Sequence, residues 1–189
     1  MIISRDAGRV EVLERRRLSI TPAVMPGTNQ PYHFAKNLNI PEAEEYLKSC
    51  LTASKQAALE ALHGLVGELH DRHYRIVGSA ILLASAHGLR PLATILASHA
   101  LIHAAEGEFF REAFSKACEE MELPITGFRE HDLDEDMQKV FGAEAVQIRE
   151  QISALGRSLG PPWTSDQKMA ALAALLVLAD RQNSSRIHH

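Results

Sequence analysis

The chain has 189 residues, of which 46% are hydrophobic and 23% charged, and its net charge is −4. This balance is typical of a globular protein with its own core, and it argues against a protein that wraps nucleic acid non-specifically, since such proteins are usually basic. The chain has no apolar run of roughly 18–20 residues and no signal-peptide pattern at its N-terminus. Its two cysteines, Cys50 and Cys118, indicate buried thiols and not a disulfide framework, so we expect a soluble, cytoplasmic protein.

The N-terminal part of the chain predicts a β-hairpin, an irregular segment and a long helix. Turn chemistry at Asp6-Ala7-Gly8 lies between β-rich stretches and predicts a hairpin within residues 2–21. Residues 22–41 contain five Pro or Gly positions and are expected to be irregular, with a polar-aromatic cluster at residues 30–33 of the kind found in binding loops. Pro41 and the acidic residues after it predict the start of a helix that ends near His70.

The middle of the chain carries a strand–helix–strand pattern. Residues 76–84 are an almost unbroken apolar run, which predicts a central strand covered on both faces. Apolar residues at three- and four-residue steps predict one long helix over residues 91–123. Residues 125–128 predict another short strand, and a long crossover of this kind implies that the two strands pair in parallel.

The C-terminal part predicts helices. Residues 132–158 are expected to form a polar helix or helix pair interrupted at Phe141-Gly142, and Thr164-Ser165-Asp166 offers cap chemistry for a last helix from residue 167 to about 181. The whole chain is therefore predicted to be α/β: a mixed sheet that starts with an antiparallel hairpin and continues parallel, with helices on both faces. We expect a single domain over residues 1–187. The last two residues, both histidines, are left out because they are typical of a purification tag.

This order of elements resembles the ribonuclease H-like fold, which starts with antiparallel strands and ends in a helix near the active edge. Enzymes of that superfamily place an Asp early on the first strand and acids near the end of the fourth strand. Here Asp6 lies at a predicted turn and residues 76–86 hold no acid, so only Asp166 falls where the resemblance implies one. The stretches SHALIHAAEGEFFREA and GRSLGPPWTSDQK also resemble segments of an uncharacterised bacterial protein family, which implies no activity.

Three polar residues of the long helix are the main candidate site. His99, His103 and Glu106 are spaced i, i+4 and i+7, which places them on one helix face. Two imidazoles one turn apart can bind one divalent metal ion, and a carboxylate can add a third ligand. The alternatives are a polar pocket without metal, or histidines that are structural. We predict that Glu106 is buried with a polar partner, and that the three residues share a pocket with His87 or Asp166.

Arg111 and His87 are candidate ligand-binding residues. Arg111 either pairs with Glu108 or holds an anionic ligand by its planar guanidinium. Gly107 inside the helix costs about 1 kcal/mol relative to alanine, which favours close access there for a backbone or a ligand. His87 follows the predicted strand of residues 76–84, and ligands gather at strand ends in open α/β sheets.

The start of the last helix offers another candidate set. Asp166 either caps its helix or is a catalytic carboxylate, with Lys168 as an anion contact. Trp163, the only tryptophan, either packs in the core or forms a pocket wall.

These residues leave three functional classes open. The leading hypothesis is an enzyme that acts on a phosphate-containing or other anionic substrate, as a metal-assisted hydrolase with Glu106 and Asp166 as catalytic acids. The second is a non-enzymatic ligand or nucleic-acid binding module, and the third is an interaction domain whose helix polar groups are structural. Each is compatible with a homo-oligomer.

Overall fold

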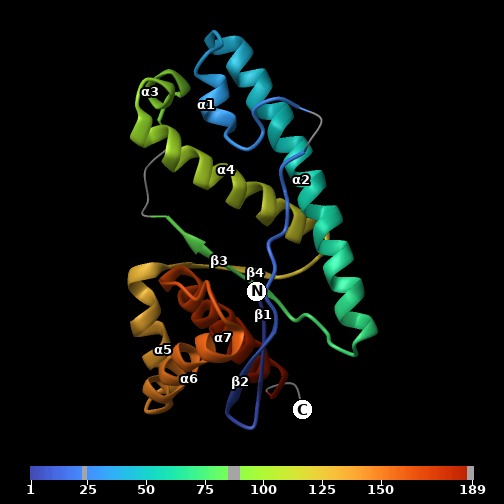
Figure 1. Cartoon of the computed structure of the whole chain (residues 1–189), viewed down its shortest axis with the longest axis vertical. Helices are drawn as coiled ribbons and strands as arrows, with labels where there is room; N and C mark the ends of the chain where they lie inside the picture. Colours follow the sequence, from blue (N-terminus) through green and yellow to red (C-terminus); the bar gives the residue numbers. More distant parts are fainter. Residues whose placement is uncertain (23–24, 85–89, 187–189) are drawn as a thin grey trace. The chain divides into compact units, whose positions relative to one another are not determined.

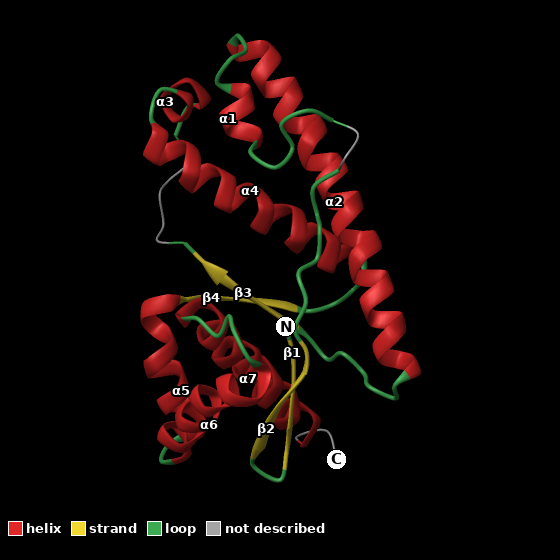
Figure 2. Cartoon of the chain, viewed as in Figure 1, coloured by secondary structure: helices red, strands yellow, loops and turns green. Residues whose placement is uncertain are grey.

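The computed structural model describes residues 1–22, 25–84 and 90–186 of the chain (Figure 1). The elements are, in chain order, β1 (Ile2–Asp6), β2 (Arg9–Glu14), α1 (Pro31–Ala35), α2 (Ile40–Asp71), β3 (Ser79–Leu83), α3 (Leu92–Leu96), α4 (His99–Glu120), β4 (Ile125–Arg129), the 3-10 helix η1 (Glu130–Asp132), α5 (Leu133–Phe141), α6 (Glu144–Leu159) and α7 (Ser165–Arg186). Figure 2 shows that helices make up most of the chain.

The chain forms two compact units. Unit 1 consists of Met1–Arg17, Val77–Leu83 and Pro124–His189, and unit 2 consists of Leu18–Ile76 and Ala84–Leu123. The chain thus leaves unit 1 after β3, contributes α3 and α4 to unit 2, and returns to unit 1 with β4. The expectation of a single domain stays a prediction. No helix in the described part of the chain is both long and apolar enough to span a membrane.

Unit 1 contains the predicted hairpin and the predicted parallel pair. Strands β1 and β2 pair antiparallel, and the turn between them places Ala7 and Gly8 at positive φ, 45° and 80°. Strand β3 pairs in parallel with β4, from Ser79 opposite Ile125 to Leu83 opposite Arg129. The α/β class and the pairing of both strand sets are therefore confirmed.

The expected single mixed sheet is replaced, within the described residues, by two separate two-stranded sheets. Strand β3 has β4 as its one neighbour there, so the prediction of a central strand was wrong. Its residues are only partly buried, and Leu83 is 41% exposed. The apolar run has another cause: Ala80 and Leu82 face the core of unit 1, where α7 packs against β3.

Helix α7 is the centre of that core. Six of the seven residues from 171 to 177 are buried: Ala171, Leu172, Ala173, Leu175, Leu176 and Val177. A helix that is apolar on all sides needs partners all round, and α7 packs against β1, β3, α5 and α6. The predicted helix pair before it is confirmed as α5 and α6, separated at Gly142, whose φ is 53°.

Unit 2 is built on α2 and α4, which pack against each other. Helix α2 begins as predicted: Asn39 caps it by accepting a 3.0 Å hydrogen bond from the Glu42 N–H. Small, fully buried residues on both helices allow a close approach of their backbones: Ala43, Cys50, Ser54 and Ala58 on α2, and Ala113, Ala117 and Cys118 on α4. Both cysteines are buried thiols, as expected.

The helix predicted over residues 91–123 is two helices, α3 and α4. Ser98 leaves the helical region with φ −128° and ψ 118°, and its hydroxyl accepts a 3.5 Å hydrogen bond from the Leu101 N–H. The apolar periodicity continues across this break, so the pattern alone does not reveal it, whereas a serine that competes for backbone hydrogen bonds can end and restart a helix. His99 is consequently the first residue of α4 and does not lie in the middle of a helix.

Candidate metal centre

Three histidine side chains converge in unit 2. His33 lies on α1, and His99 and His103 lie one turn apart at the start of α4. Each offers one ring nitrogen, and these three nitrogens lie within 4.8 Å of one another. The ring centroids are 4.8 Å apart for His33 and His103, and 4.4 Å apart for His99 and His103. We call His33, His99 and His103 the three-histidine cluster.

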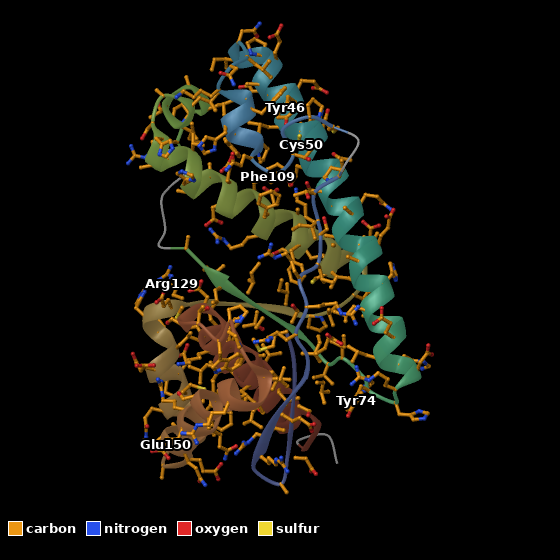
Figure 3. The ribbon with its side chains drawn as sticks, in the orientation of Figure 1. Tyr46, Cys50, Tyr74, Phe109, Arg129 and Glu150 are labelled. Atoms are coloured by element: carbon orange, nitrogen blue, oxygen red, sulfur yellow. The ribbon has the colours of Figure 1, made fainter. Side chains whose placement is uncertain are left out.

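Aromatic packing brings His33 to this position. Tyr32, its neighbour on α1, packs edge-on against Phe109 of α4 with ring centroids 6.3 Å apart. Phe34, on its other side, packs against Tyr46 of α2 at 4.6 Å, and Figure 3 labels Tyr46 on α2 and Phe109 on α4. Gly27 leaves room for this arrangement, since a Cβ there would lie 2.5 Å from the Phe34 ring. The short helix is thus held between the two long helices of unit 2.

Glu106 binds His33 twice. Its Oε1 accepts hydrogen bonds from the His33 backbone N–H at 3.2 Å and from His33 Nδ1 at 2.9 Å. Glu106 is 8% exposed, and its Oε2 lies 3.9 Å from His103 Nδ1. The prediction that Glu106 is buried with a polar partner is confirmed. An ionised carboxylate only accepts hydrogen bonds, so this contact favours the tautomer of His33 that has its proton on Nδ1 and its lone pair on Nε2.

The dimensions of the three-histidine cluster suit a transition-metal ion. Zinc binds imidazole nitrogen at about 2.0–2.1 Å, which puts the nitrogens of a tetrahedral site about 3.4 Å apart. The nitrogens here lie within 4.8 Å, so no pair has to close by more than about 1.4 Å. Rotation of the two exposed rings, His99 and His103, can supply this movement.

One side of the three-histidine cluster faces solvent. The His103 side chain is 54% exposed and His99 is also exposed, whereas the His33 side chain is 26% exposed. A metal ion there would have three protein nitrogens and room for water or a ligand oxygen. His99 is the first residue of the 22-residue helix α4, whose first turn contains no acidic residue, so the local helix dipole favours an anion beside the three-histidine cluster.

The predicted metal set was His99, His103 and Glu106, and it stays a prediction; the group of possible ligands that the structure brings together holds His33 in place of Glu106. His33 supplies the third nitrogen, and Glu106 holds His33 in place. Carboxylates that orient a ligating histidine in this way are common around protein metal sites. From the sequence, His33 was expected to belong to a polar-aromatic cluster in a loop. Its contact with α4 was not predicted, because Glu106 lies 73 residues further along the chain.

Arg111 pairs with Glu108, at 2.7 Å from its Nη2 to the carboxylate. Its guanidinium also covers Gly107, where a Cβ would lie 3.0 Å from Nη2. The space that glycine provides in α4 is therefore filled by a side chain of the same helix. A ligand-binding role for Arg111 stays a prediction.

Asp166 and Lys168 lie on α7, in unit 1. Asp166 is exposed in the first turn of α7. A side-chain hydrogen bond at this turn joins the Thr164 N–H to Gln167 Oε1 at 2.9 Å. Trp163 packs against Gly156 and donates a 2.9 Å hydrogen bond from Nε1 to the Ile152 carbonyl. The catalytic role of Asp166 and the anion contact of Lys168 stay predictions.

His87, the remaining candidate, lies outside the described residues. An open groove of about 580 Å³ lies in unit 1 between the hairpin and α6, and none of the described candidate residues lines it. Some of its polar groups engage each other: Arg5 pairs with Glu144 at 2.5 Å, and Gln151 bonds the backbone of Gly8 and Val10. The three-histidine cluster therefore carries the clearer chemistry.

Comparison of the chain with protein-family models, curated proteins and solved structures gives no match. The case for a function therefore comes from the residues of the site.

Proposed function

We propose that unit 2 binds a divalent transition-metal ion through His33, His99 and His103, and that the chain is a metal-dependent hydrolase of a phosphate-containing, anionic substrate. The observation that carries this proposal is the convergence of three ring nitrogens within 4.8 Å. Three imidazoles with an open fourth position are the ligand set of many catalytic zinc sites, whereas structural zinc sites are usually closed by four protein ligands.

A divalent ion in such a site lowers the pKa of bound water and polarises an anionic oxygen of the substrate. The residues of this chain would supply binding and orientation. His99 and His103 hold the ion from α4, His33 holds it from α1, and Glu106 fixes the tautomer of His33. The overall reaction adds water across a P–O bond and releases a phosphate product and an alcohol.

Metal binding is tested first, by isothermal titration calorimetry of the chelator-treated full chain. We expect Zn²⁺ and Co²⁺ to bind and Mg²⁺ to bind weakly, because imidazole suits transition metals while Mg²⁺ prefers oxygen ligands. His99→Ala and His103→Ala should each lower the zinc affinity at least about tenfold. His63→Ala is the matched control, since His63 is exposed on α2.

Hydrolysis is tested next, with phosphodiesters and phosphomonoesters as substrates. Turnover that requires added metal and is lost in His99→Ala would support the proposal that the chain is a metal-dependent hydrolase. Tight metal binding without turnover would instead support a non-enzymatic ligand-binding module, and absence of metal binding would refute the proposed site. The ribonuclease H-like resemblance stays a prediction.

A further inference from the structure

Interactions within helix α1 are too few to stabilise it. It has five residues, far below the length at which an isolated helix is stable in water. Pro31 occupies its first turn, and Gln30 at the N-cap makes no side-chain capping hydrogen bond. The N–H groups of its first turn therefore need partners from elsewhere in the chain.

Helix α4 provides one such partner. His33 is the third residue of α1, and its backbone N–H donates to Glu106 Oε1. Glu106 thus acts as an N-cap supplied by a different helix. The same oxygen accepts from His33 Nδ1, so one buried carboxylate both caps α1 and orients the imidazole that it presents to α4.

A metal ion in the three-histidine cluster would join α1 to α4 at the same point. His33 is the ligand from α1, while His99 and His103 are both on α4. The full set of three nitrogens exists only when α1 is docked, so the ion binds the docked form more tightly than an undocked form. Docking and metal binding then strengthen each other by the same factor.

We propose that the metal ion controls the docking of α1, so that residues 25–39 form a metal-operated clamp over the start of α4, with Glu106 as the positioning residue that couples the two events. This inference rests on the proposed metal site and adds to it a conformational response. It also assigns Glu106 a role that differs from the predicted catalytic one, because its carboxylate acts on the site through His33.

The test is amide hydrogen–deuterium exchange of the full chain, with and without Zn²⁺. The reporters are the N–H groups of Lys36, Asn37 and Leu38, which donate to the carbonyls of Tyr32, Phe34 and Ala35 within α1. If opening of α1 disrupts the site, zinc at 100 times its dissociation constant slows their exchange by up to about 100-fold. His99→Ala should abolish this slowing.

Glu106→Gln separates the positioning role from a merely structural one. We expect faster exchange of α1 without metal, zinc affinity lowered about 10- to 100-fold, and recovery of the slow exchange at saturating zinc. Glu108→Gln is the matched control, because Glu108 lies on α4 with a side chain that is 60% exposed.

The possible results separate the two proposals. Zinc that binds tightly without changing the exchange of residues 25–39 would overturn the clamp and leave the metal site intact. Zinc affinity unchanged by Glu106→Gln would overturn the positioning role of Glu106. Absence of zinc binding by the wild-type chain would overturn the metal site itself.

Discussion

Replacement of Gly156 by alanine should destabilise unit 1, although alanine is the better helix former. A Cβ at this position on α6 would lie 2.6 Å from Trp163 Cδ1 and 3.0 Å from Cγ. The indole is not free to move away, because its Nε1 donates a 2.9 Å hydrogen bond to the Ile152 carbonyl. Alanine gains about 1 kcal/mol of helix propensity, while overpacking costs about 1–3 kcal/mol. We expect a net loss of about 1 kcal/mol, with the indole displaced.

Gly64 on α2 is the matched control. A Cβ there meets nothing within 4 Å, so Gly64→Ala should stabilise the protein by about 0.5–1 kcal/mol. Both variants are measured by urea unfolding, followed by circular dichroism and by the fluorescence of Trp163, the only tryptophan.

A Gly156→Ala protein that is more stable than the wild type, with unchanged tryptophan emission, would refute this packing. Trp163 would then be free to act as the pocket wall beside Asp166 that the sequence also allows.

Two further substitutions test other contacts. Arg15→Gln removes a guanidinium that donates to the carbonyls of Leu159, Gly160 and Pro162, at 2.9, 3.1 and 2.6 Å. This substitution should lower the free energy of unfolding, measured in urea, by about 1–3 kcal/mol. If the exposed Arg17→Gln costs as much, these hydrogen bonds do not stabilise the fold. Tyr46→Phe removes a 2.6 Å hydrogen bond to the Pro26 carbonyl and should cost about 1 kcal/mol at pH 8. Burial, with the neighbouring Cys50, raises the pKa of Tyr46 in the folded protein. The stabilising effect of the Tyr46 hydroxyl is therefore complete below the unfolded pKa of about 10 and is lost as pH rises above it. The difference in free energy of unfolding between the wild type and Tyr46→Phe should thus be smaller at about pH 11 than at about pH 8. An equal difference at both pH values would contradict the raised pKa of Tyr46.

Elements with a strong local signal could be predicted from the sequence. The period of apolar residues, with Pro41 and the acidic residues after it, predicted α2, and turn chemistry at Ala7 and Gly8 predicted the hairpin. The break at Ser98 was missed because the apolar pattern runs through it. Helix α1 was missed because a five-residue helix in a proline-rich segment depends on contacts with α2 and α4, which no local pattern reveals.

The candidate site was predictable only where its residues share one helix. The spacing of His99, His103 and Glu106 correctly indicated a common face and a buried carboxylate. His33 reaches the same place through tertiary packing of Tyr32 and Phe34, so its part in the site is a property of the fold and not of the sequence pattern.

The most direct test of the three-histidine site is X-ray absorption spectroscopy at the zinc edge on the zinc-loaded full chain. We predict three imidazole nitrogens at about 2.0–2.1 Å from the ion, and a clear loss of imidazole scattering in His33→Ala relative to the wild type. A shell made mainly of oxygen, or a spectrum that His33→Ala leaves unchanged, would contradict the proposed site.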